Sequence, residues 1–187
     1  MKMGNNLKND VYSPQDDSYL LLEAIKEIRG KYALEIGCGS GVILESLIKR
    51  VEFVIGSDIN YEAIITTNNR IKKSGLLNKV ELVQCNSASA FKNCIFDIVV
   101  FNPPYLPSDG DMDISVSGGK KGIELTIKWV LEAKKVLKPK GKIYFVSSSL
   151  SHQNELINYC NSAGFFIRKI VSKKLFFEEL TIFEIKF

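Results

Sequence analysis

The sequence predicts an α/β fold: a doubly wound, mostly parallel seven-stranded sheet with one antiparallel strand in a C-terminal hairpin. Three observations lead to this prediction. Short β-branched or aromatic runs alternate with stretches of helical apolar spacing through most of the chain. Polar or glycine-rich turns follow the carboxyl ends of several strands. The last two strand-like runs have no helix between them, which predicts the hairpin.

Each element is delimited by residues that break its pattern. Gly30 ends the first helix, Gly75 ends the third, and the turn KPKG at 138–141 ends the fourth. The predicted order is helix 18–28, strand 32–36, helix 42–49, strand 53–57, helix 61–73, strand 80–83, strand 96–101, helix 123–137, strand 142–147, helix 152–163 and strands 165–171 and 180–187. Right-handed crossovers between these units favour one Rossmann-like domain over residues 1–187, with residues 1–10 as a flexible arm.

The composition is typical of a globular protein in a reducing compartment. Net charge is +4, which is only weak evidence for an acidic or nucleic-acid partner. The spacings of Cys38, Cys85, Cys94 and Cys160 match no zinc template, so we expect reduced thiols, no metal and a cytoplasmic location. No apolar run approaches the roughly 18 residues of a membrane span, so we expect no membrane partner.

The first polar carboxyl end is LEIGCGSG, residues 34–41. Gly37 and Gly39 permit a tight turn and a close approach of ligand to backbone, and Gly41 opens a helix whose N–H groups favour an anionic group. The spacing G-x-G-x-G differs from both the dinucleotide fingerprint and the P-loop. Taken alone, the motif is also compatible with an ordinary turn between strand and helix.

Two further carboxyl ends carry polar residues. Asp58 can accept two hydrogen bonds from a ribose diol or can cap the next helix. Asn86, in the stretch QCN, can contact an adenine edge or simply occupy a surface turn. Glu35 precedes the glycines and can orient an ammonium group. Together these residues predict a site for a nucleoside with an amino-acid tail, which is the chemistry of S-adenosylmethionine.

The motif FNPPY follows the most apolar strand, residues 96–101. The side-chain oxygen of Asn102 and the carbonyl of Pro103 can accept the two N–H groups of a planar amide or amine. Pro104 keeps the two residues before it out of helical angles, and Tyr105 offers a flat face for stacking. An asparagine also avoids placing a full charge beside a sulfonium. A rigid connector is the alternative interpretation.

Five motifs, in order, resemble one known family. VYSPQDDSYLLLEAI at 11–25 is followed by LEIGCGSG, SDIN, FNPPYLP and the stretch GGKKGIE at 118–124. The chain resembles class I S-adenosylmethionine-dependent methyltransferases, and within them the short archaeal and eukaryotic branch of the HemK-type glutamine methyltransferases. The resemblance implies methyl transfer to the side-chain amide of the glutamine in a Gly-Gly-Gln tripeptide of a translation release factor.

The resemblance also assigns residues and a partner. Asn102, Pro103 and Tyr105 would grip the glutamine. The cofactor-binding residues would be Tyr12, Pro14, Asp17, Ser18, Glu35, Gly37, Cys38, Gly39, Asp58, Ile59, Asn86 and Asn102. The branch usually has aspartate where this chain has Asn86, so we expect a weakened adenine contact there. A small zinc-binding activator subunit would add a strand near residues 53–55.

Two other functions remain open at this point. The same corner could serve methylation of the adenine exocyclic amine in DNA or RNA, with the base stacked on Tyr105. A non-catalytic scaffold is the second alternative. We expect a structural role for His152, and a solvated flap for the carboxylates Asp109, Asp111 and Asp113 because no complete calcium-loop pattern follows them.

Overall fold

The computed structural model describes residues 11–108 and 117–187. The proposed arm, residues 1–10, and the flap with Asp109, Asp111 and Asp113 lie outside the described residues.

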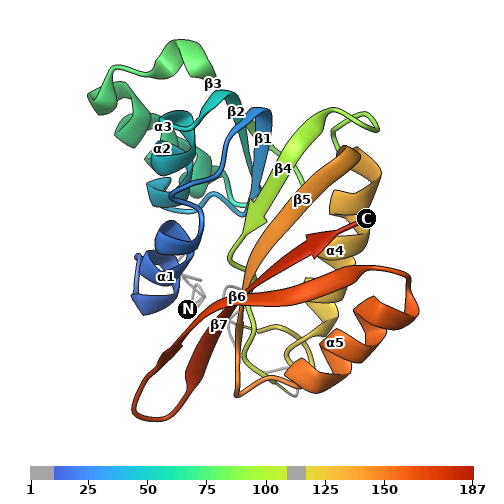
Figure 1. The fold of residues 1–187 in the computed structure, drawn as a ribbon. Coiled ribbons are helices and arrows are strands. Elements are labelled where there is room, and N and C mark those ends of the chain that lie inside the picture. The colour runs from blue at the N-terminus through green and yellow to red at the C-terminus, as the bar shows by residue number, and fades with distance from the viewer. Residues whose placement is uncertain (1–10, 109–116) are drawn as a thin grey trace, which may run out of the picture.

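All seven strands of the described chain form one sheet in the order β3-β2-β1-β4-β5-β7-β6 (Figure 1). Their bounds are β1 Gly30–Ile36, β2 Val51–Asp58, β3 Val80–Gln84, β4 Phe96–Phe101, β5 Leu137–Ser148, β6 Phe166–Lys174 and β7 Glu179–Lys186. The first five strands pair in parallel, and β7 runs antiparallel to both β5 and β6. The predicted fold, with its single antiparallel strand in a C-terminal hairpin, is confirmed.

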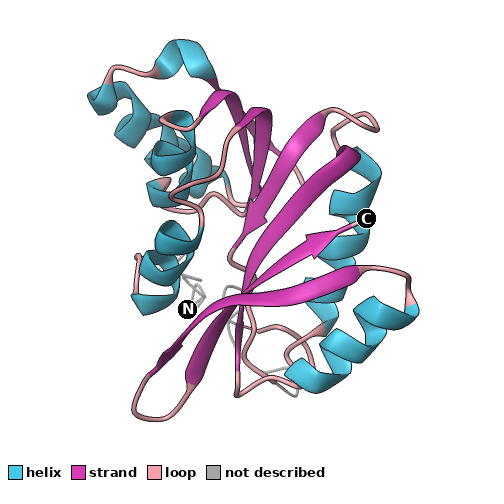
Figure 2. Ribbon diagram, in the orientation of Figure 1, coloured by secondary structure: helices cyan, strands magenta, loops and turns pink. Residues whose placement is uncertain are grey.

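Helices cover both faces of the sheet (Figure 2). Their bounds are α1 Asp16–Ala24, α2 Val42–Ile48, α3 Tyr61–Ser74, α4 Glu124–Val136 and α5 Gln153–Ser162, with a short 3₁₀ helix, η1, at Leu77–Lys79. Buried residues of α1, α2 and α3 belong to one apolar cluster, and those of α4 and α5 to a second cluster across the sheet. The α3 bounds follow from its caps: the Asn60 side chain accepts from Glu62 N at 2.9 Å, and Gly75 adopts the left-handed conformation.

The start of β5 differs from the prediction. The strand begins at Leu137, directly after α4, and not at Lys142. Leu137 is buried and pairs with Phe96, and the register then shifts before Ile98 pairs with Lys142. The turn residues KPKG therefore form a bulge within the strand, with Lys140 at φ +68°, because burial of Leu137 extends the pairing past them.

The expected pairing site for an activator strand, residues 53–55, is wrong. Phe53 to Ile55 lie in β2, which is hydrogen-bonded to β1 on one side and to β3 on the other. A further strand cannot add to a strand whose two sides are both paired. Among the described strands, β3 and β6 are the outer ones.

Stacked phenylalanines fix the end of β4. The Phe101 and Phe145 rings stack with centroids 5.4 Å apart, and Phe145 stacks on Phe183 at 5.5 Å. All three side chains are fully buried. The backbone that leaves β4 at Asn102 therefore starts from a rigid position. Within the described residues, none of the helices has the length and apolarity that a membrane crossing requires.

Candidate active site

The site lies where the strand order reverses, between β1 and β4. Ile36 at the end of β1 pairs with Phe101 at the end of β4, so the chain leaves both strands at the same level of the sheet. The segment after β1 leads to α2 on one face, and the segment after β4 leads to α4 on the other. Ligands of doubly wound sheets bind in the crevice that such a divergence opens.

Asn102, the first residue of the corner after β4, is held in one orientation. Its Nδ2 donates to Oδ2 of Asp17 at 2.9 Å. A carboxylate can only accept hydrogen bonds, so the nitrogen of the amide, and not its oxygen, must face Asp17. The Oδ1 atom of Asn102 is consequently left over: it is buried and has no hydrogen-bond partner among the described residues. The corner thus presents one oriented, unused acceptor.

Asp17 is the centre of this arrangement. Only 3% of it is exposed, and its Oδ2 also accepts from Tyr12 Oη at 2.8 Å and from Tyr105 Oη at 3.2 Å. Ser18 donates to the other oxygen through its backbone N–H and its hydroxyl. Burial, and next the charge of Asp17, raises the pKa of both tyrosines, so their hydroxyls stay protonated and keep donating. These donors compensate the desolvation of the carboxylate.

The corner is supported from behind by residues 117–122. Gly118 N donates to Leu106 O at 2.9 Å, and a Cβ on Gly118 would lie 2.7 Å from the Pro104 carbonyl oxygen. Gly122 has φ +72°, and a Cβ there would clash with the Tyr105 carbonyl oxygen. Two backbones approach each other here at a distance that only glycine permits. The sequence identified this stretch through the family resemblance alone and missed its supporting role.

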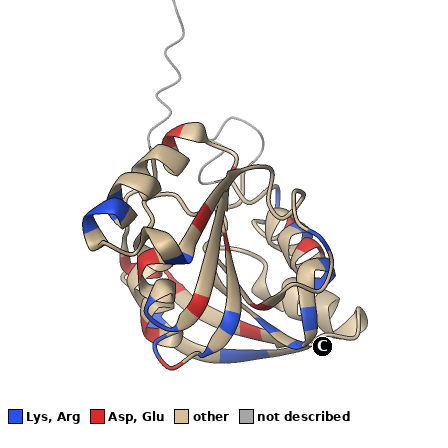
Figure 3. Ribbon diagram, turned by 90° about the horizontal axis from the view of Figure 1, so that it is seen from above, with Lys and Arg blue, Asp and Glu red and all other residues tan. Residues whose placement is uncertain are grey.

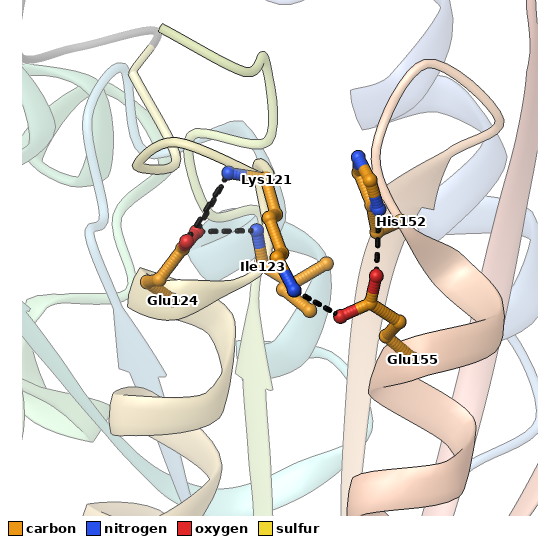
Figure 4. Close-up of polar contacts among 5 residues, drawn as sticks. All are labelled: Lys121, Ile123, Glu124, His152 and Glu155. Carbon is orange, nitrogen blue, oxygen red and sulfur yellow. Dashed lines mark hydrogen bonds and ion pairs between the residues drawn. The ribbon is translucent and has the colours of Figure 1, made fainter. Parts of the chain in front are cut away.

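Glutamate side chains join this support to α4 and α5 (Figure 4). Glu124 accepts from the N–H groups of Lys121 and Ile123 at the start of α4. Glu155 on α5 pairs with Lys121 Nζ at 2.5 Å and with His152 Nδ1 at 2.9 Å. The side chain of His152 is therefore hydrogen-bonded to Glu155 at the surface, apart from the hydrogen bonds of the corner.

The glycine loop after β1 lies beside the corner. Gly37, Gly39 and Gly41 all have positive φ, at +72°, +48° and +76°. A Cβ on Gly41 would come within 2.9 Å of Thr67, so packing within the protein requires that glycine. A Cβ on Gly39 would meet nothing closer than the Gly37 oxygen at 4.0 Å. Open space above Gly39 is what a ligand that approaches the backbone needs.

Asp58, at the end of β2, holds the loop in place. Its Oδ2 accepts from Gly39 N at 3.0 Å, and its Oδ1 accepts from Asn60 N at 2.9 Å. Each carboxylate oxygen has a further lone pair, so the residue can still accept from a diol. The neighbouring Ile59 is exposed, and Asn86 is exposed beyond the end of β3. Asp58 pairs with Gln84, two residues before Asn86, so the ends of β2 and β3 bring these residues to the same edge of the sheet.

Glu35 lies beneath the loop with only 4% of its surface exposed. Its Oε2 is buried and has no hydrogen-bond partner among the described residues. Burial, and next the nearby charge of Asp58, raises the pKa of the Glu35 carboxyl well above its ordinary value of 4.5. Burial likewise raises the pKa of the Cys38 thiol, which makes that cysteine an unreactive part of the loop. A cation near Glu35 would satisfy the free oxygen.

Trp129 on α4 connects the two halves of the site. Its ring meets Phe101 edge to face at 5.5 Å, and it lies 3.1 Å from the position of a Cβ on Gly37. Its Nε1 is buried and has no hydrogen-bond partner among the described residues. In the sequence, Trp129 follows the helical apolar spacing of residues 123–137, which by itself indicates only a core residue. No signal in the sequence distinguishes a core tryptophan from one that also packs against a ligand loop.

The remaining predicted residues lie in or next to the segment that leads into α1. Pro14 is partly buried two residues before the start of α1, next to the segment that carries Tyr12. Tyr12, Asp17 and Ser18 were predicted from the resemblance as cofactor residues. The structure places Tyr12 in direct contact with Asp17, and Asp17 in direct contact with Asn102 and Tyr105 of the corner.

Comparisons with known proteins agree with this geometry. The model of the methyltransferase small domain family matches residues 8–162. A putative protein N5-glutamine methyltransferase of Methanocaldococcus jannaschii is 34% identical over 185 residues, which cover 94% of this chain and 91% of the relative. The human methyltransferase HEMK2 is 28% identical over 87% of this chain and 83% of its own length.

A solved structure shares the fold over almost the whole chain. It is the E. cuniculi Mtq2–Trm112 complex, described as responsible for methylation of the eRF1 translation termination factor. The TM-score is 0.78 at 27% sequence identity, and the match covers 95% of this chain and 98% of the other.

Proposed function

The chain belongs to the methyltransferase small domain family, among the HemK-type protein-glutamine methyltransferases, and we propose that it methylates a translation release factor. The acceptor would be the side-chain amide nitrogen of the glutamine in a Gly-Gly-Gln tripeptide. The observation that carries the proposal is the Oδ1 atom of Asn102, which is buried, without a hydrogen-bond partner in the described chain, and fixed in orientation by Asp17.

An amide nitrogen is a poor nucleophile because its lone pair is delocalised into the carbonyl group. Asn102 Oδ1 would accept one N–H of the substrate amide, and the carbonyl of Pro103 would accept the other. Two acceptors that grip both hydrogens orient the nitrogen lone pair and stabilise the positive charge that develops on the nitrogen. The methylated nitrogen then loses a proton readily to water, so no strong base is required.

Tyr105 would pack its ring against the planar amide of the substrate. Its hydroxyl donates to Asp17, which holds the ring in place before any substrate binds. The raised pKa of the hydroxyl keeps it neutral, so Tyr105 adds no negative charge beside the acceptor. Tyr105 therefore acts as a positioning surface and not as a base.

The residues after β1 and β2 fit S-adenosylmethionine as cofactor. Bound there, it would supply an electrophilic methyl group on a sulfonium, whose S–C bond breaks as the new N–C bond forms. The unpartnered carboxyl oxygen of Glu35 suits its ammonium group, and the open space above Gly39 suits its amino-acid tail. Asp58 would accept from the ribose hydroxyls, and exposed Ile59 and Asn86 would border the adenine.

We extend the proposal to a small activator subunit, because the E. cuniculi structure is a complex of Mtq2 with Trm112. A partner that adds a strand to the described sheet must pair with β3 or β6, its outer strands. Co-expression with candidate small partners, followed by size-exclusion chromatography, tests this extension. If no complex forms and the isolated chain is fully active, the extension is wrong.

Isotope-labelled S-adenosylmethionine tests the main proposal. We expect label on an intact release factor and none on a factor whose tripeptide glutamine is replaced. Label on DNA or RNA would instead support adenine methylation. The net charge of +4 and the interspersed charges in Figure 3 do not favour that alternative. Label on none of these substrates would favour a non-catalytic scaffold.

A further inference from the structure

The hairpin of β6 and β7 extends past the sheet at the edge that carries the active site (Figure 1). Ser148, the last residue of β5, pairs antiparallel with Leu180 of β7. The turn at residues 175–178 therefore lies beyond the carboxyl end of β5. Phe145 of β5 pairs with Phe101, so the Asn102 corner opens on this same edge.

Two phenylalanines occupy the tip of this hairpin. Phe176 is 91% exposed and Phe177 is 83% exposed, more than any other large apolar side chain in the described residues. Their rings contact each other edge to face with centroids 4.5 Å apart. Adjacent exposed aromatic side chains are costly in water and mark surfaces that bind a partner.

The tip is presented by an ordered turn. Leu175 N donates to Glu178 O at 2.7 Å, which closes the turn, and Glu179 N donates to Ser149 Oγ at 2.8 Å. Ser148 also donates to the carboxylate of Glu178. Because hydrogen bonds hold the backbone on both sides of the two phenylalanines, the fold keeps these side chains exposed.

The hairpin also contacts the elements of the active site. Lys173 Nζ pairs with Asp16 Oδ1 at 2.7 Å. Asp16 immediately precedes Asp17, which accepts a hydrogen bond from Asn102. Glu178 lies close enough to Tyr12 that its charge contributes to the raised pKa of that tyrosine. A protein whose glutamine reaches Asn102 must therefore pass close to this hairpin.

We propose that Phe176 and Phe177 form a docking surface for the protein substrate, which binds them through an apolar patch outside its Gly-Gly-Gln loop. This inference rests on the proposed function. The strand that leads to the tip, β6, has the sequence FIRKIVSKK, with four basic and no acidic residues. Two of these residues, Arg168 and Lys173, already pair with Glu184 and Asp16. Glu178 and Glu179 directly follow the two phenylalanines, so the surroundings of the tip carry both charges and the apolar contact itself provides the docking.

The test compares a protein substrate with a peptide. The enzyme with both Phe176→Ala and Phe177→Ala is assayed on the intact release factor and on a short peptide that contains Gly-Gly-Gln. We expect KM for the intact factor to rise about tenfold or more, because aromatic anchors dominate docking energies. We expect kcat, the peptide kinetics and the affinity for S-adenosylmethionine to stay within about twofold of the wild type.

Phe166→Ala is the matched control. Phe166 is also an exposed phenylalanine of the hairpin, 62% exposed, but it starts β6 and pairs with Lys186 at the opposite end. The nine residues of β6 place it roughly 25 Å from the tip. We expect no change in KM for either substrate. The variant Phe176→Leu with Phe177→Leu should retain most of the docking, since it keeps an apolar tip.

Three results would overturn the inference. The first is an unchanged KM for the intact factor in the double alanine variant. The second is an equal rise in KM for factor and peptide, which would place the phenylalanines at the glutamine itself. The third is binding of anionic phospholipid vesicles that the double variant loses while its kinetics stay normal, which would indicate a membrane surface. A wild-type enzyme that methylates neither substrate would instead refute the proposed function, and this inference with it.

Discussion

The corner after β4 and the glycine loop after β1 lie side by side, yet they bury their charged groups in opposite ways. Asp17, behind the corner, receives hydrogen bonds from Tyr12, Asn102, Tyr105 and Ser18. Glu35, beneath the loop, has one oxygen without a partner in the described chain and a raised pKa. The carboxylate behind the corner therefore has its partners before a ligand arrives, whereas the carboxyl group beneath the loop has an oxygen that a cation could satisfy.

This difference separates positioning from binding. The unused oxygen at the corner belongs to an amide, which is neutral at every pH, and its burial costs about 1–3 kcal/mol. The unused oxygen at the loop belongs to a carboxyl group, which can take up a proton when no cation is present. The substrate side is therefore expected to respond mainly to geometry, and the cofactor side mainly to pH. Four predictions test this contrast.

Removing the oriented oxygen should have the largest effect. In Asn102→Ala, one of the two acceptors that we propose for the substrate amide is lost, so we expect kcat to fall about 1000-fold. Binding of S-adenosylmethionine, measured by calorimetry, should stay near the wild type. If cofactor affinity falls in parallel with kcat, Asn102 belongs to the cofactor side and the contrast drawn above is wrong.

Changing the residue that orients Asn102 should have the second largest effect. In Asp17→Asn, position 17 can donate as well as accept, so the Asn102 amide is free to turn over and present its NH₂ to the substrate. We expect kcat to fall about 10- to 100-fold with little change in cofactor affinity. Single-turnover kinetics on the peptide substrate isolate this step from product release.

A charge exchange controls for simple loss of packing. Asn102→Asp alone places two carboxylates at the 2.9 Å contact, so we expect activity to be lost and stability to fall. Combining it with Asp17→Asn restores one carboxylate and one amide to the pair, and should recover part of the activity. A double variant no better than Asn102→Asp would show that the orientation of the pair does not matter.

The regular elements were predictable because their patterns are local. The strand at 96–101 has the predicted bounds since an apolar β-branched run ends at a proline pair. The start of β5 was missed because KPKG has the composition of a turn, and only pairing with a distant strand draws Leu137 into the sheet. The pairing of β2 on both sides depends on strand order, which is a property of the whole sheet and not of the strand itself.

The sequence nominates residues for the candidate site, but it does not predict the hydrogen bonds between them. Asn102 and Pro103 followed from the chemistry of one short motif. Asp17 is 85 residues away from Asn102, and no spacing rule predicts that it accepts from that side chain. Exposure of Phe176 and Phe177 likewise depends on a hairpin register that the sequence does not specify. Long-range hydrogen bonds and the exposure of side chains can be determined only from the folded structure.

The third prediction concerns residues 117–122, which pack behind the corner. In Gly122→Ala, the new methyl group meets the Tyr105 carbonyl, and φ +72° is unfavourable for alanine. We expect unfolding free energy to fall by about 3 kcal/mol, measured by urea denaturation. Gly75→Ala is the matched control: it has the same φ of +72° but nothing within 4 Å, so it should cost only about 1 kcal/mol. Equal losses would show that the close backbone contact at the corner contributes nothing to stability.

Glu35→Gln should have the smallest effect, and it should raise the stability of the ligand-free protein while it lowers the affinity for the cofactor. The folded pKa of Glu35 is raised above 4.5, so its contribution to stability is fully present below pH 4.5 and is lost as pH rises through the folded pKa. Glutamine removes this loss, so the ligand-free variant should be more stable than the wild type at neutral pH. The same change removes the partner that we propose for the ligand ammonium group, so we expect affinity for S-adenosylmethionine to fall about tenfold. In the wild type that affinity should increase with pH, because the bound cation requires the ionised carboxylate, and in the variant this increase should disappear.

Thermal unfolding without ligand measures the change in stability, and calorimetry across pH measures the change in cofactor affinity. A variant that loses stability and keeps its affinity would place the cation elsewhere and remove the contrast between the two regions.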